Sequence, residues 1–170
     1  MFTYKIVLIG DFGTGKTSLV SRFVDNSFSE EYISSIGVSI SRKNINTILN
    51  DNNYNSTIMI WDIEGKTDFK PILSHYLNGA KGFIIVADLT RKKSIESIIE
   101  HIELCEKTMP NLPICIALNK SDLEHGDVDM EELKNLAPNI IWVSKTSAKE
   151  ANGVEELFSF LNKKIIERLL

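Results

Sequence analysis

The sequence runs Gly10-Asp11-Phe12-Gly13-Thr14-Gly15-Lys16-Thr17 directly after an apolar stretch from Tyr4 to Ile9, which predicts a buried strand. The eight residues match the pattern G-x-x-x-x-G-K-[ST] at every fixed position. Glycines let such a loop wrap so that successive main-chain N–H groups point at phosphate oxygens, and the following helix N-terminus adds partial positive charge. The sequence therefore predicts a phosphate-binding loop whose contacts come from Gly13, Thr14, Gly15, Lys16, Thr17 and Ser18.

Two side chains of this loop carry specific expectations. Lys16 is expected to reach the β- and γ-phosphates of a nucleotide, and the Thr17 hydroxyl is expected to ligate Mg²⁺. The alternative is a glycine-rich turn that binds nothing. Its position between a predicted strand and a predicted helix favours the phosphate loop.

A second motif, Asn119-Lys120-Ser121-Asp122, predicts which base is bound. It follows the expected strand Ile114 to Leu118 at its C-terminal end, where open α/β sheets bind ligands. Asp122 can accept hydrogen bonds from the N1–H and 2-amino groups of guanine, and adenine lacks both donors. The segment Thr146-Ser147-Ala148-Lys149 follows the last expected strand, so its N–H groups can meet the guanine O6. Taken alone, Asn-Lys-x-Asp is also compatible with a solvated turn. The expected guanine site comprises Asn119, Lys120, Asp122, Ser147, Ala148 and Lys149.

The third motif is Trp61-Asp62-Ile63-Glu64-Gly65, at the end of another expected strand. In phosphate-loop proteins an Asp here holds the magnesium shell, and the Gly N–H reaches the γ-phosphate. Asp62 and Gly65 take these expected roles. The alternative for Asp62 is a helix cap.

Short apolar runs alternate with helical patterns along the whole chain, which predicts an α/β fold. The expected strands are 4–9, 38–49, 55–61, 82–87, 114–118 and 140–143. The turn-rich Asn50-Asp51-Asn52-Asn53 leaves no room for a helix, so the second and third strands should form an antiparallel hairpin at the sheet edge. Helical periodicity includes Ile95, Ile98, Ile99 and Ile102 in one stretch. Expected caps pair Asn152 with Glu155 and Asp129 with Glu132.

Composition describes one ordinary domain of 170 residues, with 19 basic and 23 acidic residues and a formal charge of −4. This balance argues against a nucleic-acid binder. The longest apolar run, Phe83 to Ala87, is far shorter than the ~20 residues of a membrane-spanning helix. Cys105 and Cys115 are expected to be small buried hydrophobes, and a cytoplasmic location is expected.

With these motifs in this order, the chain resembles a small GTPase of the Ras superfamily over essentially every residue. It is most similar to the Rab branch. Residues 25–38 resemble the first switch of Rab proteins, and Trp61-Asp62 and residues 76–80 also match that branch. The resemblance implies a three-layer α/β phosphate-loop NTPase fold, the Ras-like G domain. It would span residues 1–170, with a six-stranded, mostly parallel sheet, one antiparallel edge strand and about five helices.

The resemblance also implies roles at matching positions. Phe28 would pack on the guanine base, Tyr32 would close over the phosphates, and Ser35 would replace the usual Thr that reaches Mg²⁺ and the γ-phosphate. GDP or GTP with Mg²⁺ would be bound by a monomer. Switch residues would meet effector, exchange-factor and GTPase-activating proteins in vesicle traffic, with apolar contacts from Ile36, Gly37, Val38, Trp61 and Phe69. For Trp61 and Phe69 a core position is the alternative.

Rab-like proteins are usually anchored to endomembranes through a flexible prenylated tail, and this sequence stops at Ile166-Glu167-Arg168-Leu169-Leu170 within its last helix. No lipidation motif is available in these residues. Either the tail lies beyond this sequence or the protein is unanchored. A membrane association is expected only through such a tail.

Two departures from the family pattern concern hydrolysis. Lys66 stands where the family has the Gln that orients the attacking water, and an ammonium has no acceptor for that water. Losing such a preorganised group costs roughly two to three decades in rate. Phe12 stands where Gly or Ser is usual, and its ring should crowd the γ-phosphate and any arginine finger. Lys16, Gly65 and Lys66 are thus the residues expected at the reacting phosphate. In the alternative, Lys66 neutralises γ-phosphate charge or pairs with Glu64 and activity is kept.

Three functions therefore stay open. The first is a GTP switch with slow hydrolysis. The second is a module that captures trafficking partners while locked in the GTP state. The third, an ATP-dependent kinase of the phosphate-loop class, is disfavoured by the guanine motif.

Overall fold

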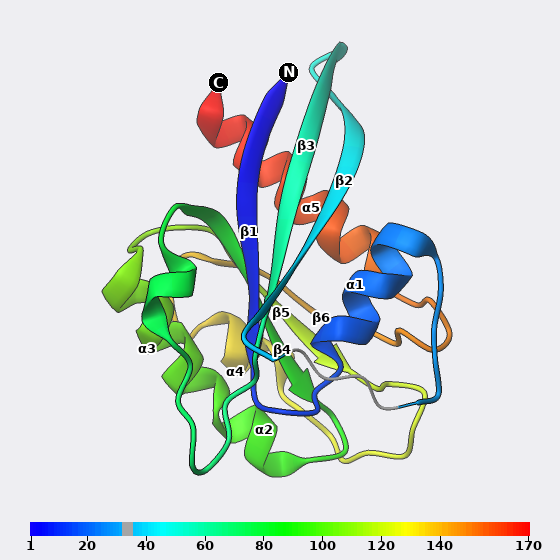
Figure 1. Ribbon diagram of the computed structural model, residues 1–170, viewed down its shortest axis with the longest axis vertical. Helices are drawn as coiled ribbons and strands as arrows, with labels where there is room; N and C mark the ends of the chain where they lie inside the picture. Colours follow the sequence, from blue (N-terminus) through cyan, green and yellow to red (C-terminus); the bar gives the residue numbers. More distant parts are fainter. Residues whose placement is uncertain (32–35) are drawn as a thin grey trace.

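The computed structural model describes residues 1–31 and 36–170, and its centre is a six-stranded sheet (Figure 1). The strands follow the order β2-β3-β1-β4-β5-β6, and among these pairs only β2 and β3 are antiparallel. This confirms the expected mostly parallel sheet with an antiparallel edge strand. The bounds are β1 Phe2–Gly10, β2 Val38–Leu49, β3 Asn52–Ile63, β4 Ala80–Asp88, β5 Ile114–Asn119 and β6 Ile140–Lys145.

Five α-helices and one 3₁₀ helix occur in the described residues. The stretch expected as one helix around Ile98 is divided at Ser97 into a short helix and a longer one. The bounds are α1 Lys16–Asp25, η1 Ser74–Leu77, α2 Lys92–Glu96, α3 Ile98–Thr108, α4 Met130–Lys134 and α5 Val154–Leu169.

The helices cover both faces of the sheet and make three layers (Figure 1). Alternate residues of the strands point to opposite faces, so Ile6 and Leu8 join the core under α1 and α5, whereas Val7 and Ile9 join the core under α3 and α4. On the first face the rings of Phe23 and Phe158 stack with centroids 4.0 Å apart. The central strands are buried on both sides, which explains their continuous apolar sequences.

The β2–β3 hairpin is longer than its apolar content predicts. β3 was expected from Asn55 to Trp61, but main-chain pairing continues to Leu49 opposite Asn52 at one end and Val38 opposite Ile63 at the other. The loop is therefore two residues, Asn50 and Asp51, both with positive φ (48° and 63°). Asn and Asp tolerate this conformation, and tight hairpin turns of this type need it at both positions.

The two expected helix caps have different outcomes. Asp129 caps α4, and its Oδ1 accepts a hydrogen bond from Glu132 N at 3.1 Å. The expected cap at Asn152 is wrong. The residue before α5 is Gly153, at φ 71°, and the Asn152 amide donates instead to the Glu150 carboxylate.

The buried side-chain amide of Asn162 bonds α5 to the sheet, at the end remote from the phosphate loop. Asn162 of α5 accepts hydrogen bonds from the hydroxyls of Tyr4 on β1 and Ser56 on β3, and it donates to Thr47 Oγ1 on β2 at 2.6 Å. The last helix is thus bonded to three adjacent strands. Because an unsatisfied buried polar group is costly, this network fixes the register of α5 on the sheet.

Cys105 and Cys115 are both buried and unoxidised, as expected, and burial raises the pKa of each thiol. Among the described residues, no helix combines the length and apolar character needed to cross a bilayer.

Candidate functional site

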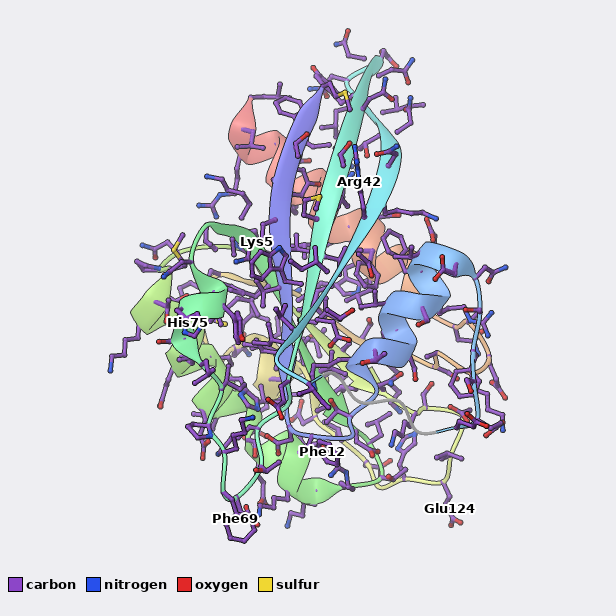
Figure 2. The ribbon with its side chains drawn as sticks, viewed as in Figure 1. Lys5, Phe12, Arg42, Phe69, His75 and Glu124 are labelled. Atoms are coloured by element: carbon purple, nitrogen blue, oxygen red, sulfur yellow. The ribbon has the colours of Figure 1, made fainter. Side chains whose placement is uncertain are left out.

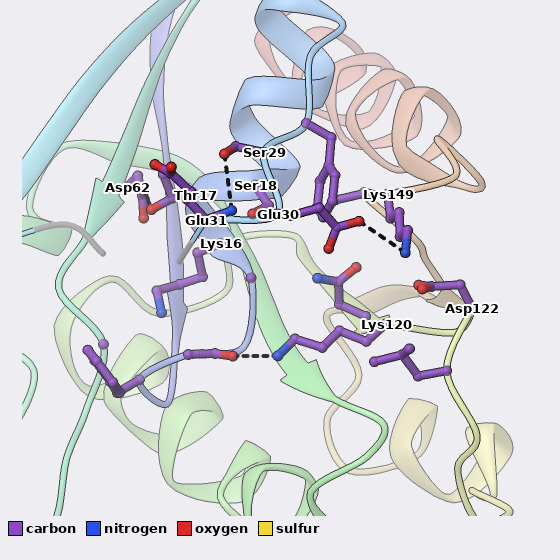
Figure 3. Close-up of a pocket in the computed structure, with 18 of the residues that line it drawn as sticks. Lys16, Thr17, Ser18, Ser29, Glu30, Glu31, Asp62, Lys120, Asp122 and Lys149 are labelled. Atoms are coloured by element: carbon purple, nitrogen blue, oxygen red, sulfur yellow. Dashed lines mark hydrogen bonds and ion pairs between the residues drawn. The ribbon is translucent and has the colours of Figure 1, made fainter. Parts of the chain in front are cut away.

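A cleft opens at the carboxyl ends of the parallel strands, where the loops after β1, β3, β5 and β6 meet (Figure 3). All three sequence motifs contribute to its walls. The lining comprises Phe12, Gly13, Gly15, Lys16, Thr17, Ser18, Phe28, Ser29, Glu30, Glu31, Asp62, Ile63, Gly65, Asn119, Lys120, Asp122, Leu123, Ala148 and Lys149. A single groove therefore joins the expected phosphate, magnesium and base sites.

The loop between β1 and α1 requires glycine at one particular contact. Gly15 has φ 97°, and a Cβ there would lie 2.3 Å from Asn119 Nδ2. The same Asn119 amide donates to the main-chain oxygen of Thr14 at 3.0 Å. Glycine thus permits the phosphate loop and the Asn-Lys-Ser-Asp loop to lie in direct contact.

Lys16 is the first residue of α1 and is buried, with 6% of its surface exposed. Its Nζ donates to the main-chain oxygen of Asp11 at 3.1 Å, so the ammonium is held under the loop (Figure 3). Burial lowers the pKa of Lys16 to about 8, although the carboxylates of Asp62 and Asp11 act in the opposite direction. A phosphate in the cleft would lie beside this desolvated ammonium and would raise its pKa, because a nearby negative charge favours the protonated form.

Two oxygen side chains meet beside Lys16. Thr17 Oγ1 donates to Asp62 Oδ2 at 2.6 Å, although the residues are 45 positions apart in the sequence. Thr17 is the second residue of α1, whereas Asp62 is buried near the end of β3. A hydroxyl and a carboxylate are hard oxygen donors, and Mg²⁺ is usually bound by one or two protein oxygens with waters and phosphates completing its shell. The donor set fits that ion.

The loop after β5 is bonded to the phosphate loop by two side chains. Besides the contact of Asn119 with Thr14, Lys120 Nζ donates to the oxygen of Gly13 at 3.0 Å. Lys120 also lies 2.9 Å from Asp88 at the end of β4. Asn119 in turn accepts from Thr146 Oγ1 at 3.1 Å. These contacts hold the loops after β1, β4, β5 and β6 in one fixed arrangement.

Asp122 is half-buried and has one oxygen held by the adjacent loop. Ser147 Oγ donates to Asp122 Oδ1 at 2.8 Å, and Ser147 Oγ itself accepts from Glu150 N at 3.0 Å. The Ser147 side chain is fully buried and does not line the cleft. The Ser147 hydroxyl therefore orients the Asp122 carboxylate at the wall of the cleft.

An exposed ion pair spans the mouth of the cleft. Lys149 Nζ lies 3.1 Å from Glu30 Oε1, and this contact raises the pKa of Lys149 (Figure 3). The sequence pointed to Lys149 but not to Glu30, because no local signal pairs the segment after α1 with the loop after β6, which is 119 positions away. Phe28 on the same segment is half-buried and lines the cleft, and its packing on a base stays a prediction.

The segment after β3 is joined to the phosphate loop by main-chain bonds. Phe12 N donates to the oxygen of Lys66 at 2.8 Å, and Lys66 N donates to the oxygen of Gly10 at 3.0 Å. Gly65 lies so close that a Cβ would be 2.6 Å from Phe12 Cα. The two segments that would flank a γ-phosphate are therefore already in contact.

Lys66 directs its side chain away from the cleft. Its ammonium pairs with Glu100 on α3, whereas Glu64 pairs with Lys70 at 2.7 Å and accepts from Gly37 N at 3.4 Å. The expected alternative in which Lys66 pairs with Glu64 is therefore wrong in this structure. Glu100 is 34 positions from Lys66, so no local sequence signal indicated it.

A further cation near the phosphate loop was missed. Arg91 Nη2 donates to the main-chain oxygen of Phe12 at 2.6 Å, and Arg91 Nε lies 3.2 Å from Asp88. Burial alone would raise the pKa of Asp88, but hydrogen bonds from Thr90 and Lys120 hold it below its usual value. Asp88 is the last residue of β4. Its place at the carboxyl end of a parallel strand is the sequence signal that could have indicated Asp88 and its partner Arg91.

Most of the expected site residues lie together, with three kinds of exception. Thr14 and Ser147 are fully buried and support the cleft from behind, and Lys66 faces α3. Tyr32 and Ser35, expected at the phosphates and Mg²⁺, lie outside the described residues. The other expected positions line the cleft.

Comparison with known proteins places this geometry in a family. The model of the Ras family matches residues 5–167. The chain belongs to the Ras family of small GTPases. It is accordingly a guanine-nucleotide-binding protein of a class that hydrolyses GTP.

The relatives place it among the Rab-like members of the Ras superfamily. It is 38% identical to the Ras-related protein YPT3 of Nicotiana plumbaginifolia. The alignment of 161 residues covers 93% of this chain and 72% of the relative. It is 37% identical over 171 residues to the Ras-related protein RABD2a of Arabidopsis thaliana, covering 99% and 82%. Identity to the Ras-related protein Rab-1A of Dictyostelium discoideum is 34% over 171 residues, covering 99% and 83%.

In this Ras-family chain the residues expected to meet effectors differ in exposure. Ile36 is 87% and Phe69 98% exposed, so a core position for Phe69 is wrong. Figure 2 shows Phe69 at the tip of the loop that follows β3. Trp61 is half-buried, with Lys5 Nζ 3.4 Å from the centroid of its ring. Gly37 and Val38 are also partly exposed.

Proposed function

We propose that this Rab-like protein is a GDP/GTP switch in vesicle and membrane traffic on the cytosolic face of endomembranes, with slow intrinsic hydrolysis. The observation that carries the nucleotide site is the shared cleft, in which Lys16, the Thr17–Asp62 pair and the Ser147-oriented Asp122 face one groove. The polyphosphate lies on the loop from Gly13 to Ser18. The base lies between Phe28 and the loop of Asn119, Lys120 and Asp122.

Mg²⁺ is the cation proposed for the Thr17–Asp62 pair, with Ser35 as a further ligand. When bound, it neutralises negative charge on the phosphates. Thr17 and Asp62 supply its protein oxygens, and Lys16 adds a second positive charge on the same side of the nucleotide. Asp122 discriminates for guanine, because adenine offers that carboxylate no N1–H or 2-amino donor.

Slow hydrolysis follows from the side chain of Lys66. A lysine ammonium donates but cannot accept, so it cannot accept a hydrogen bond from the attacking water while donating another to the γ-phosphate. Its ion pair with Glu100 also directs the ammonium toward α3 instead of the cleft. With Phe12 lining the same end of the cleft, hydrolysis lacks its usual water-positioning group and has less space.

The second candidate is a module that stays in the GTP state and captures trafficking partners. The Lys66–Glu100 pair favours it as well, because both candidates follow from weak hydrolysis. The bound nucleotide after purification distinguishes the two: GDP supports a switch that turns over, and GTP supports a locked module.

Single-turnover hydrolysis of wild type and Lys66→Gln tests the proposal. The glutamine variant should be faster by roughly 10²-fold, the size of effect usual for one preorganised polar group. Lys70→Gln is the matched control, since Lys70 is in the same segment but pairs with Glu64. If Lys66→Gln is no faster than wild type, the proposed role of Lys66 fails. Absence of GDP binding would overturn the nucleotide site itself.

A further inference from the structure

A second groove of about 490 Å³ lies between α2, the first turn of α3 and the segment from Gly126 through α4. Its floor is apolar, because Leu89 and Leu133 are buried there. Its upper walls are apolar and accessible: Ile99 is 50% and Leu136 39% exposed. The groove is large enough to receive several side chains of another molecule.

The rim of this groove is acidic. Carboxylates come from Glu96 on α2 and from Asp127, Asp129 and Glu132 on the opposite wall. The ammonium that faces them is Lys92, which lies 3.7 Å from Glu96 and is 89% exposed. Among the lining residues, Lys92 offsets Glu96 on the α2 wall, whereas Asp127, Asp129 and Glu132 leave the opposite wall negative beside the apolar floor.

We propose that this groove, formed by α2, α3 and α4, docks an amphipathic helix of a partner protein with apolar residues at helical spacing and Lys or Arg on its flanks. The apolar floor takes the buried face of such a helix, and the acidic rim pairs with its basic flanks. The same rim repels an anionic membrane surface. It also repels the identical rim of a second copy, so self-association through this face is disfavoured.

The groove is separate from the nucleotide cleft. None of the residues that line it lines the cleft, and none lies in the segment 64–73 between β3 and η1. The docking surface therefore goes beyond the proposed switch, and binding to it should be equal in the GDP and GTP states. A failure of this inference is distinguishable from a failure of the switch, whose partners depend on nucleotide.

The probe is a fluorescein-labelled 16-residue helical peptide with Leu at positions 4, 7, 8, 11 and 15 and Lys on both flanks. A matched peptide carries Glu in place of Lys. We expect fluorescence anisotropy to show the Lys peptide binding the full chain at least about tenfold more tightly, with affinity falling as salt rises. GDP and a non-hydrolysable GTP analogue should give the same affinity.

Variants locate the site. Ile99→Ser, and separately the double change Glu96→Gln with Glu132→Gln, should each weaken the Lys peptide by at least about fivefold. The controls are Ile48→Ser, an exposed isoleucine of the hairpin, and Glu103→Gln, an exposed carboxylate of α3 outside the groove. Both should bind as wild type does, and circular dichroism checks that all variants fold.

Three outcomes would overturn the inference. The first is equal binding of the Lys and Glu peptides. The second is loss of binding in the control variants to the same extent as in the groove variants. The third is a concentration-dependent dimer, or sedimentation with phosphatidylserine vesicles, that Ile99→Ser abolishes, because a second copy or a membrane would then be the occupant.

Discussion

Lys66 is paired with Glu100 on α3, whereas Glu64, two positions before it, is paired with Lys70 at 2.7 Å. The two ion pairs direct neighbouring side chains to different partners. Lys66 is directed toward the helical layer, and Glu64 stays within its own loop, where it also accepts from Gly37 N. Substitutions of Lys66 and of Glu64 therefore break different ion pairs, one with α3 and one within the loop.

Glu100→Gln should leave GTP hydrolysis unchanged within about twofold. Freeing the ammonium gives Lys66 no acceptor for the attacking water, so the missing function is not restored. The free energy of unfolding should change by less than about 1 kcal/mol, because both side chains are partly exposed and such pairs contribute little. Single-turnover kinetics and urea denaturation measure the two quantities. A tenfold faster rate would instead support the alternative in which Lys66 neutralises γ-phosphate charge.

Affinity for GDP should fall as the pH rises above about 8. The pKa of Lys16 in the nucleotide-free protein is about 8, and bound phosphate raises it, so binding favours the protonated form. The contribution of Lys16 is therefore fully present below pH 8 and declines above it, by up to tenfold per pH unit. Dissociation constants between pH 7 and 9 measure this. The ratio of wild type to Lys16→Met cancels any titration of the nucleotide, and a ratio independent of pH would contradict the prediction.

Ser147→Ala should weaken GDP binding roughly tenfold or more without a change in fold. The substitution removes the hydrogen bond that orients Asp122, and a bond to a charged group contributes roughly 1.5 kcal/mol or more. Isothermal titration calorimetry with GDP is the measurement. Ser121→Ala is the matched control, because Ser121 bonds the loop after β6 through its main-chain N–H, which alanine keeps. Equal affinities for both variants would show that Asp122 needs no support from Ser147.

Gly65→Ala should destabilise the nucleotide-free protein by roughly 1–3 kcal/mol. The added Cβ would lie 2.6 Å from Phe12 Cα and 2.7 Å from Phe12 N, and main chain cannot move aside without breaking the bonds between the two segments. Gly126→Ala is the control, because no atom lies within 4 Å of a Cβ there. Thermal unfolding of both variants compares the two sites. A neutral Gly65→Ala would mean that the contact between these segments is weak.

The sequence alone predicted those parts of the protein that short-range chemistry determines. The bounds of β2 were right because polar turn residues delimit it. The three motifs lie around one cleft because each is at the carboxyl end of a parallel strand, and their roles toward a nucleotide stay a prediction. Long-range pairing explains what was missed. β3 is longer than its apolar run because β2 pairs with it throughout. Glu100 and Arg91 lie outside any motif, and they contact Lys66 and Phe12, which are far away in the sequence.

Two local predictions failed or were incomplete for a reason visible in the contacts. Asn152 has the right side chain for a helix cap, but its amide bonds Glu150 and its main-chain oxygen accepts from Ser147 N. Ser97 interrupts the expected single helix, and its hydroxyl donates to the oxygen of Lys93 at 2.9 Å. In both cases a polar side chain bonds nearby main chain or side chain in preference to the expected pattern.

The Asn162 network lies at the end of the molecule that is suited to attaching a label or a surface. It binds α5 to β1, β2 and β3, and both chain ends lie at this end of the sheet, opposite the cleft (Figure 1). A biosensor chip or a fluorescent label attached at either end would therefore leave the nucleotide entrance pointing into the flowing buffer, so kinetic traces from immobilised protein would report on an unobstructed site.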